Sequence, residues 1–362
     1  MTHTHCIIMA GGIGARFWPM SRTAKPKQFI DILGTGTTLI QQTYQRLKNI
    51  CPPENIYVVT HELYKNLVLE QLPELTEDQV LLETCRRNTA PCTAYAAYKI
   101  KKKDPDAILV VAPSDHIIQK EEVFVEKIDA AIRAASENDW LVTLGIKPSR
   151  PDTGYGYIQF NKNINDDRYE GLSKVKTFTE KPNHDLAITF LESGEFLWNS
   201  GIFIWSLKSI LKAFDDYLPE ISQLFSQGND EYFTPAEPDF VRNTYAVCKS
   251  ISIDYGIMEH AQNVYVIESD FGWSDLGTWG SLHEILKKDD NNNAVTGKQV
   301  LTYDTRNSII NMPCDKLVVL QGLDDYIVVE DDNTLLICRK QDEQQIRQIV
   351  NDVRMQKGER FV

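Results

Sequence analysis

Three glycines and two cations near the N-terminus have the types and spacing of phosphate-binding residues. The string MAGGIGARFWP places Gly11, Gly12 and Gly14 ahead of Arg16. Glycines at such a turn tolerate positive φ and let backbone N–H groups approach a phosphate closely. Arg16 is able to bind phosphate oxygens through two N–H groups at once, and Lys27 adds a second cation about ten residues later. We therefore expect this segment to bind a polyphosphate.

The spacing of these glycines excludes two other nucleotide-binding loops. The dinucleotide-binding fingerprint GxGxxG needs a third glycine where this chain has Phe17, which argues against a dehydrogenase. The GxxxxGK[ST] loop of P-loop proteins occurs nowhere in the chain. On these residues alone, a structural turn with surface cations stays open as the alternative.

A single aspartate follows the most apolar run of the chain. Asp115 comes directly after AILVVAPS, whose apolar part at 107–112 predicts a strand buried on both faces. Ligands of α/β sheets bind just beyond the carboxyl ends of the strands, which is where Asp115 is expected to lie. A lone aspartate after a strand also serves as a turn or cap residue, so the pattern by itself leaves both roles open.

The elements that must position these residues alternate along the first half of the chain. Strands are predicted over 6–9, 56–60, 107–112 and 141–146, and helices over 38–49, 90–103 and 122–136. This β-α-β rhythm favours a mostly parallel, doubly wound sheet with helices on both faces. After Pro148, predicted strands at 175–179, 201–205 and 264–268 and helices at 185–193 and 252–261 continue the same sheet.

The composition changes again from about Asn291. Short β runs separated by Asp, Asn and Gly turns are followed by an amphipathic helix predicted over 343–355. The polar run KKDDNNN at 287–293 marks a boundary. We therefore predict a catalytic domain over residues 1–288 and a C-terminal β domain with a terminal helix over residues 289–362.

Charge and cysteine usage limit the kinds of partner and compartment. The net charge is −13, from 38 Lys and Arg against 51 Asp and Glu, which argues against nucleic acid or an anionic membrane as partner. The seven cysteines are odd in number, scattered and without a CxxC pair, as in a reduced compartment. The N-terminus passes straight into a strand-like run, and no run approaches the roughly 18 apolar residues of a membrane span. We expect a cytoplasmic protein.

The N-terminal string as a whole resembles the sugar-nucleotide pyrophosphorylase family, whose motif is AGG-x-G-x-R followed by a lysine. Ala10 to Arg16 and Lys27 match it. The strings GARFWPMSR and KPKQF resemble the branch that joins GTP to mannose 1-phosphate, although Ala15 replaces the usual threonine and its hydroxyl. The resemblance implies that Arg16 and Lys27 hold the triphosphate. It also implies that Gly11 and Gly12 lie against the base and ribose.

Two further segments resemble the nucleotide and metal sites of the family. RNTAP, which begins with Arg87, Asn88 and Thr89, resembles a segment near the nucleotide, although helix capping alone would explain Asn88 or Thr89. In the family, an aspartate that matches Asp115 and the aspartate of WSDxGTW, here Asp275, bind Mg²⁺. Mg²⁺ takes few carboxylates besides phosphate and water oxygens, so two aspartates are sufficient. No cluster with zinc spacing competes for the role.

The sugar side rests on four segments that match in order. By resemblance, Glu180 of the EKP motif binds sugar hydroxyls and Lys181 binds the sugar phosphate. Asn199 contacts the sugar or phosphate, and Asp254 is a further candidate sugar contact. The loop TGYGYI, which contains Gly154 and Tyr155, lines the sugar. Each segment alone would be read more often as a plain turn.

The resemblance implies a fold, a reaction and an assembly. The fold is a Rossmann-like doubly wound mixed sheet with a small C-terminal domain like a left-handed β-helix, although the hexapeptide pattern of that domain is poorly marked here. The reaction is Mg²⁺-dependent in-line attack of mannose 1-phosphate on the α-phosphate of GTP. The catalytic residues are Arg16, Lys27, Asp115, Lys181 and Asp275. A homodimer through the C-terminal β segment is the assembly that the family suggests.

Two alternatives stay open. A related enzyme with another pair, such as UTP, dTTP or ATP with glucose 1-phosphate or GTP with a heptose phosphate, would keep the same catalytic residues. A non-catalytic regulatory paralogue would be expected to lose Arg16, Lys27, Asp115 or Asp275, and all four are present. Some relatives carry an isomerase domain after the transferase. With 362 residues, we expect a transferase without isomerase activity.

Overall fold

The computed structural model describes residues 3–165, 168–312 and 315–362, so that Cys314 lies outside the described residues. The chain divides into two compact units. Unit 1 comprises Met1–Gly11, Thr43–Ser114 and Ile118–Trp273, and unit 2 comprises Gly12–Gln42, Asp115–Ile117 and Ser274–Val362. The N-terminal glycine loop and Asp115 thus group with the C-terminal third. The domain boundary at 288/289 stays a prediction.

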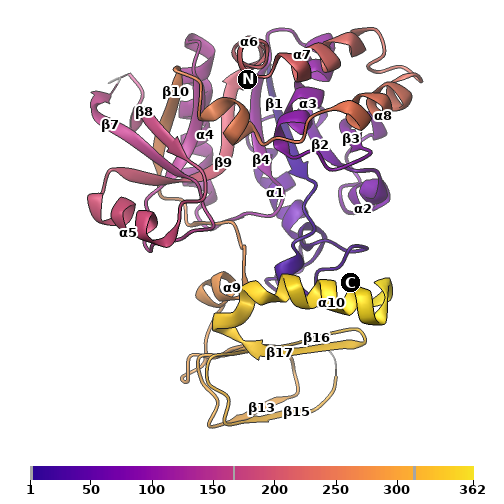
Figure 1. Ribbon diagram of the computed structural model, residues 1–362, viewed down its shortest axis with the longest axis vertical. Helices are drawn as coiled ribbons and strands as arrows, with labels where there is room; N and C mark the ends of the chain where they lie inside the picture. The colour runs from indigo at the N-terminus through magenta and orange to yellow at the C-terminus, as the bar shows by residue number, and fades with distance from the viewer. Residues whose placement is uncertain (1–2, 166–167, 313–314) are drawn as a thin grey trace. The chain divides into compact units, whose positions relative to one another are not determined.

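Unit 1 is built on one large sheet (Figure 1). Within the described residues it has nine strands in the order β3-β2-β1-β4-β9-β6-β10-β8-β7. Their bounds are β1 Thr4–Ala10, β2 Ile56–His61, β3 Val80–Glu83, β4 Ile108–Pro113, β6 Leu141–Ile146, β7 Tyr157–Asn165, β8 Leu172–Thr179, β9 Phe196–Ser206 and β10 Val264–Ser269. Each predicted strand of the first 270 residues overlaps one of these, although the strands predicted at 6–9, 175–179 and 201–205 start two to five residues later than β1, β8 and β9 do.

The sheet is mixed, as the family resemblance implies, whereas the mostly parallel sheet favoured by the β-α-β rhythm was wrong for the second half. Strands β1 to β4 pair in parallel, as do β6 and β10. Strand β9 is antiparallel to both β4 and β6, and β8 is antiparallel to β10 and β7. An apolar run such as that of β9 shows that a strand is buried on both faces, but it carries no information about direction.

Helices cover both faces of this sheet, as expected (Figure 1). One face shares a core with α3 (Thr89–Lys103), α6 (Leu207–Tyr217), α7 (Pro219–Ser226) and α8 (Glu237–Val247). Helix α4 (Glu121–Glu137) packs on β4, β6, β9 and β10, and its buried Phe124 and Ile128 stand outside that core. Two further helices, α1 (Leu39–Leu47) and α5 (His184–Ser193), lie where helices were predicted. Helix α2 (Lys65–Gln71) was not predicted and lies between two predicted strands. The helix predicted over 252–261 is only a π-helical turn, Asp254–Met258.

The C-terminal part of unit 2 is like a β-helix because the chain alternates between two small sheets. One sheet holds β12 (Ala294–Thr296), β14 (Ile309–Asn311), β16 (Tyr326–Asp331) and β17 (Thr334–Arg339), and the other holds β13 (Val300–Tyr303) and β15 (Val318–Gln321). All pairs except β16 with β17 are parallel. Short strands β5 (Ile117–Ile118) and β11 (Trp273–Ser274) precede it in the chain.

Two side-chain clusters hold unit 2 together. A small one, built from Ile310, Met312 and Val328, fills the space between the two sheets. A larger one joins the N-terminal segment to helix α9 (Trp279–Ile285), to the β strands and to helix α10 (Ile346–Lys357). Helix α10 begins three residues after its predicted start because the 3₁₀ turn Lys340–Gln345 precedes it.

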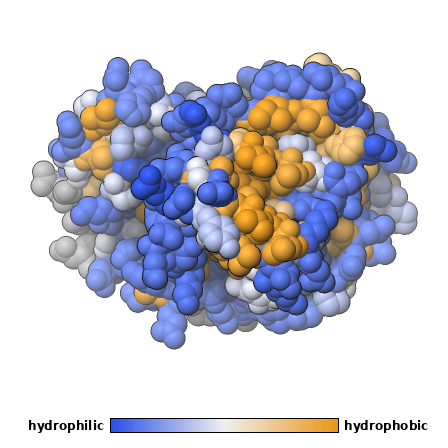
Figure 2. All heavy atoms as spheres, turned by 90° about the horizontal axis from the view of Figure 1, so that it is seen from below, coloured by the Kyte–Doolittle hydropathy of each residue, from blue (hydrophilic) through white to orange (hydrophobic). Residues whose placement is uncertain are grey.

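The outer face of β13 and β15 exposes apolar side chains. Leu301 and Val319 are directly paired across the two strands and are 47% and 54% exposed, and Tyr303 beside them is 55% exposed. Figure 2 shows apolar atoms gathered on this side of the unit. Among the described residues, every helix is too short or too polar to cross a bilayer.

Candidate functional site

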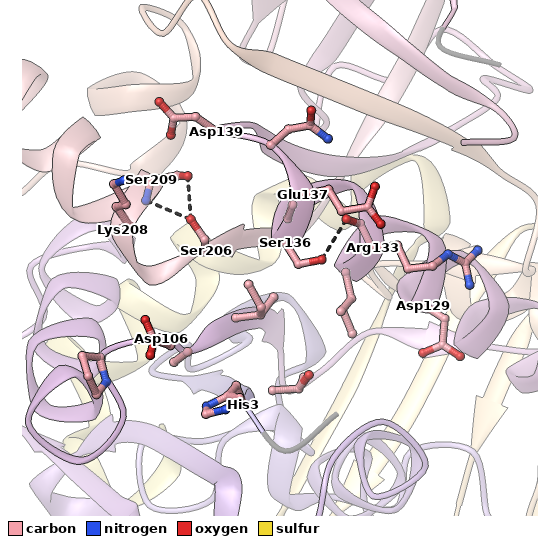
Figure 3. Close-up of a pocket in the computed structure, with 17 residues that line it drawn as sticks. His3, Asp106, Asp129, Arg133, Ser136, Glu137, Asp139, Ser206, Lys208 and Ser209 are labelled. Carbon is pink, nitrogen blue, oxygen red and sulfur yellow. Dashed lines mark hydrogen bonds between the residues drawn. The ribbon is translucent and has the colours of Figure 1, made fainter. Parts of the chain in front are cut away.

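A cavity of about 800 Å³ in unit 1 contains none of the predicted site residues (Figure 3). His3, Thr4 and Ile108 line it at the amino ends of β1 and β4, together with Arg133 of α4 and Lys208 of α6. The predicted residues Gly11 and Asp115 follow the carboxyl ends of those strands instead. Because α/β sheets bind ligands at carboxyl ends, we place the candidate site there rather than in this cavity.

The glycine loop folds back on the residues around Lys27. Gly14 has φ 72°, and a Cβ at this position would lie 2.5 Å from the Cβ of Lys27, so only glycine fits. Lys27 N–H donates to the carbonyl of Ile13 at 3.2 Å, and Gln28 Nε2 donates to the carbonyl of Gly12 at 2.9 Å. Apart from its two chain neighbours, no heavy atom of the residues that the structure describes lies within 4 Å of a Cβ built at Gly12, so the packing does not require that glycine.

Lys27 is the central cation of the site in unit 2. Its side chain is buried, and Nζ forms an ion pair with Asp115 Oδ2 at 2.8 Å. The same ammonium donates to the backbone carbonyls of Asp275 at 3.0 Å and Leu276 at 2.9 Å. One lysine therefore connects both predicted metal ligands to the glycine loop.

The carboxylate of Asp115 is kept ionised by its neighbours. Burial alone would raise the pKa of Asp115, but the charges of Lys27 and His116 and the hydrogen bond from Lys27 outweigh it and lower the pKa. The side chain remains 30% exposed. Asp115 is thus an anionic oxygen donor that solvent or a ligand reaches.

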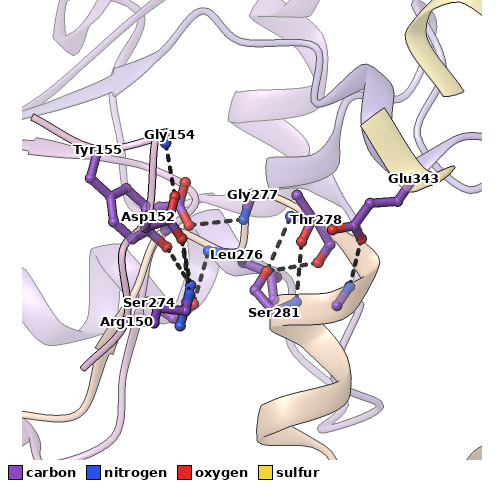
Figure 4. A network of polar contacts seen from close by, with 12 residues as sticks. Arg150, Asp152, Gly154, Tyr155, Ser274, Leu276, Gly277, Thr278, Ser281 and Glu343 are labelled. Atoms are coloured by element: carbon purple, nitrogen blue, oxygen red, sulfur yellow. Dashed lines mark hydrogen bonds and ion pairs between the residues drawn. The ribbon is translucent and has the colours of Figure 1, made fainter. Parts of the chain in front are cut away.

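Asp275 is held by the turn that starts helix α9, whose residues Leu276, Gly277 and Thr278 are shown in Figure 4. Its Oδ1 accepts the N–H of Gly277 at 3.0 Å. Leu276 takes a positive φ of 47°, and its N–H donates to Ser274 Oγ at 3.1 Å. Thr278 then caps α9 by accepting the N–H of Ser281 at 3.2 Å. The Asp275 carboxylate is therefore fixed beside the two backbone carbonyls that accept hydrogen bonds from the Lys27 ammonium.

These two aspartates fit a divalent cation that takes most of its ligands from elsewhere. Within residues 3–165, 168–312 and 315–362, no group of three or more His, Cys, Asp or Glu is suited to hold a metal. A cation that needs a full protein cage, such as structural Zn²⁺, is therefore not served by the described residues. Mg²⁺ uses one or two carboxylates with phosphate and water oxygens, which agrees with Asp115 and Asp275.

Arg16 lies in the short 3₁₀ turn Ala15–Phe17 and is partly buried. Its Nε donates to Oε1 of Gln344 at 2.8 Å, across 328 residues of sequence. Phe17, the next residue, is buried against Trp279, with ring centroids 5.0 Å apart. The arginine is thus attached to both the core and the C-terminal turn of unit 2.

In unit 1, the end of β1 lies against a buried carboxylate. Ala10 is fully buried in the strand, and a Cβ at Gly11 would lie 3.4 Å from Glu83 Oε2. Tyr245 donates its hydroxyl to Glu83 Oε1 at 2.9 Å. Burial raises the pKa of Glu83 to about 7, against the hydrogen bond from Tyr245 and the charge of Arg86. An acceptor with a near-neutral pKa therefore borders the glycine.

Arg86, which the motif match did not single out, contacts Gly11. Its Nε donates to the Gly11 carbonyl at 3.1 Å and its Nη2 to the hydroxyl of Tyr64 at 2.9 Å. Arg87 instead donates to the carbonyls of Tyr245 and Ala246, both at 3.0 Å. The sequence shows only that two arginines are adjacent. It does not show which of them contacts the glycine loop.

Asn88 and Thr89 form the start of helix α3. Asn88 has φ 69°, and its Oδ1 accepts the N–H of Thr89 at 3.0 Å. Thr89 Oγ1 accepts the N–H of Ile253 at 2.9 Å. Asn88 therefore caps the helix, whereas Thr89 connects the first turn of the helix to a distant segment of the chain. Their contact with a nucleotide stays a prediction, as does that of Arg87.

The predicted sugar residues of unit 1 converge on one carboxylate cluster. Asn199 Nδ2 donates to Asp254 Oδ1 at 2.8 Å, and a Cβ at Gly156 would lie 2.4 Å from Glu180 Oε2 and 3.4 Å from the Cβ of Asn199. Lys181 Nζ contacts Glu180 Oε1. Burial, followed by the charge of Glu180, raises the pKa of Asp254 to about 6. Two carboxylates, an amide and an ammonium thus offer both acceptors and donors to a polar ligand.

The loop with Gly154 and Tyr155 is anchored beside this cluster. The N–H of Gly154 donates to Asp152 Oδ1 at 2.8 Å (Figure 4). The ring of Tyr155 packs edge-on against Trp198, with centroids 4.9 Å apart, and Trp198 directly precedes Asn199. The structure therefore brings Tyr155 to the same strand as the predicted sugar residue Asn199.

Comparisons with known proteins agree with the observed fold. Residues 5–292 match the family described as nucleotidyl transferase, and residues 298–353 match a MannoseP isomerase/GMP-like beta-helix domain. These matches confirm the expected α/β domain followed by a β-helix-like domain.

Similar proteins cover most of the chain. Mannose-1-phosphate guanylyltransferase of Escherichia coli is 36% identical over 353 residues, covering 95% of this chain and 74% of that protein. The protein of the same name from Salmonella montevideo is 37% identical over 357 residues, covering 97% and 74%. A crystal structure named mannose-1-phosphate geranyltransferase, from Thermus thermophilus, matches with a TM-score of 0.86 and 28% identity, covering 97% of this chain and 99% of that chain.

Proposed function

This chain belongs to the nucleotidyl transferase family, and from that premise we propose that it transfers GMP from GTP to α-D-mannose 1-phosphate, releasing GDP-mannose and pyrophosphate. The observation that carries the proposal is the buried Lys27, which contacts Asp115 and the Asp275 turn beside the glycine loop. The relatives named above act, by their names, on mannose 1-phosphate.

The proposed reaction is an in-line displacement at the α-phosphorus. A phosphate oxygen of mannose 1-phosphate forms a bond to the α-phosphorus, and the bond from that phosphorus to the bridging oxygen of the β-phosphate breaks. The nucleophile is already anionic, so no side chain has to take a proton. The difficulty lies in bringing two polyanions together, which makes positioning and charge neutralisation the main contributions.

The residues divide between the two reacting groups. Arg16 and Lys27 hold the triphosphate and stabilise the leaving pyrophosphate. Lys181 orients the attacking sugar phosphate. Asp115 and Asp275 would hold Mg²⁺, which supplies positive charge to the phosphate oxygens when bound.

The carboxylate cluster supports a sugar as the second substrate. Glu180 and Asp254 are acceptors for sugar hydroxyls, and Asn199 offers an amide from the same cluster. Lys181 is 59% exposed and contacts Glu180, so its ammonium is reachable by a phosphate while its charge offsets the carboxylates. A cluster with both hydroxyl acceptors and one cation matches a sugar phosphate better than an apolar ligand.

Glu83 supports guanine over other bases. Guanine presents two neighbouring donors, its N1–H and its N2 amino group, and a carboxylate accepts both at once. The Glu83 carboxylate borders Gly11, where the resemblance places the base. We propose that Glu83 reads guanine, and that Gly11 leaves the room for this approach.

The exposed face of β13 and β15 supports a homodimer. Its paired Leu301 and Val319 with Tyr303 form an apolar surface on a parallel two-stranded sheet (Figure 2). Contiguous exposed apolar surface of this kind marks interaction sites on proteins. A second copy of the chain is the partner that this proposal names.

Pyrophosphate release tests the proposal directly. Each of the four NTPs is combined with mannose 1-phosphate or glucose 1-phosphate in the presence of Mg²⁺. We expect GTP with mannose 1-phosphate to be strongly preferred. Preference for another pair would overturn the substrate assignment and keep the reaction class, whereas a lack of release with every pair would overturn the activity.

A matched pair of variants tests the site. Asp275→Asn removes a proposed metal ligand and should lower the rate by about two decades. Asp270→Asn alters an aspartate that comes shortly before Asp275 in the sequence, whose side chain is 87% exposed and pairs with Lys120, and it should leave the rate unchanged. Equal rates in the two variants would refute the role of Asp275.

A further inference from the structure

The 3₁₀ turn Lys340–Gln345, at the end of the β-helix-like region, reaches the arginine of the glycine loop. We propose that Gln344 is a positioning residue for Arg16, through which the C-terminal region of unit 2 orients the phosphate-binding guanidinium. This inference rests on the proposed function, since that function makes Arg16 a phosphate ligand. It assigns a role in the reaction to Gln344, which belongs to none of the motifs described above.

The geometry of one hydrogen bond carries the inference. Arg16 Nε donates to Gln344 Oε1 at 2.8 Å. The guanidinium is planar and rigid, so an acceptor fixed at Nε also fixes the directions of the two terminal nitrogens. Bidentate binding of a phosphate depends on those directions. Loss of Gln344 removes this acceptor and so widens the range of directions that the guanidinium can take.

The residue before Gln344 holds the other half of the site. Glu343 Oε2 accepts the N–H of Gly280 at 2.8 Å, in the first turn of helix α9 (Figure 4). That helix directly follows the Asp275 turn. Burial raises the pKa of Glu343 above its usual value. The hydrogen bonds with Gly280 and Thr278 and the charge of Arg16 offset only part of this increase. Two consecutive side chains therefore contact the arginine loop and the start of the helix that follows Asp275.

The turn is itself fixed to the same core as the loop that it orients. Ile346 and Val350 of helix α10 belong to one buried cluster with Phe17 and Trp279. Trp18 Nε1 also donates to the carbonyl of Phe361 at 2.6 Å. Anchoring on both sides means that Gln344 holds Arg16 against a rigid support, as preorganised sites require.

Gln344 is exposed, which separates its proposed role from stability. Substitution of an exposed polar side chain that fills no core position changes stability little. Loss of a hydrogen bond to a charged group, in contrast, weakens the function that depends on it by on the order of tenfold. Gln344→Ala is therefore expected to reduce kcat/KM for GTP about tenfold. The KM for mannose 1-phosphate and the melting temperature should be unchanged.

Gln345→Ala is the matched control. Gln345 is the neighbouring glutamine of the same turn, is also exposed, and donates to Asp342 instead of accepting from Arg16. A double-mutant cycle with Arg16→Ala gives the second readout. If Gln344 acts through Arg16, adding Gln344→Ala to Arg16→Ala should cause no further loss in kcat/KM.

Three results would overturn the inference. They are wild-type kinetics in Gln344→Ala, an equal loss in Gln345→Ala, and a full additional loss in the Arg16→Ala background. If the unchanged protein turns over no substrate pair, the proposed function fails separately. The inference is then decided by titration calorimetry with GTP and Mg²⁺, in which Gln344→Ala should bind about tenfold more weakly than the unchanged protein. Equal affinities, or no binding by either protein, would overturn it.

Discussion

Replacement of Lys27 by methionine separates its catalytic role from its structural one. Methionine keeps most of the length of the stem and removes the charge. The Lys27 side chain is buried, and its three N–H donors have three oxygen acceptors: Asp115 Oδ2 and the carbonyls of Asp275 and Leu276. Lys27→Met is therefore expected to change both the stability of the fold and the rate of the reaction, and the size of each change can be worked out separately.

The structural cost follows from the acceptors that lose their donor. A buried acceptor left without a partner costs about 1–3 kcal/mol. The two backbone carbonyls bear this cost, whereas Asp115 is 30% exposed and regains water. We expect unit 2 to lose about 3 kcal/mol of stability while remaining folded. The catalytic cost of removing one cation aimed at the reacting phosphates is also about 3 kcal/mol, or two decades in rate.

Two measurements on the same preparation distinguish these effects. Urea denaturation followed by circular dichroism gives the free energy of unfolding, and pyrophosphate release below the transition gives the turnover of the folded protein. Lys25→Met is the control, because Lys25 is an exposed lysine of the same loop. Near-normal turnover in folded Lys27→Met would refute the role of Lys27 at the phosphates. Unchanged stability would refute the role of its carbonyl contacts.

Three further predictions concern the carboxylates and the exposed β face. In the folded chain the pKa of Glu83 is raised from 4.5 to about 7, so between these values the native state keeps a proton that the unfolded state releases. The free energy of unfolding should therefore fall by roughly 3 kcal/mol as the pH rises from about 4.5 to 7. Urea titrations should show this loss in the unchanged protein and not in Glu83→Gln; a flat profile in both would contradict it. Asp254 has a pKa of about 6, so its carboxylate is lost as pH falls through that value, and the KM for mannose 1-phosphate should rise below about pH 6. Asp254→Asn should raise the KM at neutral pH and abolish this dependence, and an unaltered profile would argue against a sugar contact. Leu301→Asp together with Val319→Asp should convert a dimer into a monomer in light scattering, and a monomeric unchanged protein would rule out the dimer.

The strands of the first half could be predicted because their apolar runs report burial directly. The runs at 56–60 and 141–146 each lie within a strand of the structure, and the run at 107–112 begins one residue before its strand. The direction of β9 could not be predicted, because direction depends on the path of the connection and not on side-chain burial. The π-helical turn at Asp254–Met258 was overestimated as a helix because local propensity does not reveal where tertiary contacts end an element.

The site was predicted as a set of residues, and the contacts among them were not. Lys27, Asp115 and Asp275 stand in separate segments, and only the folded chain joins them through one ammonium. The sequence did not predict that Arg86 would turn toward Gly11 and Arg87 away from it, because both residues have the same chemistry. Gln344 lies 328 residues from Arg16, and no local pattern reports such a pair.

The ion pair between Lys27 and Asp115 has a consequence for how ligands enter. All three donors of the ammonium are in use, so an incoming phosphate oxygen gains this cation only by displacing one of its present acceptors. Asp115 is the acceptor that is most readily displaced, because it alone is a partly exposed side chain and the other two are backbone carbonyls. The Asp115 carboxylate thus uses the donor that a phosphate oxygen would need, and it neutralises a cation that would otherwise be buried without a counter-charge.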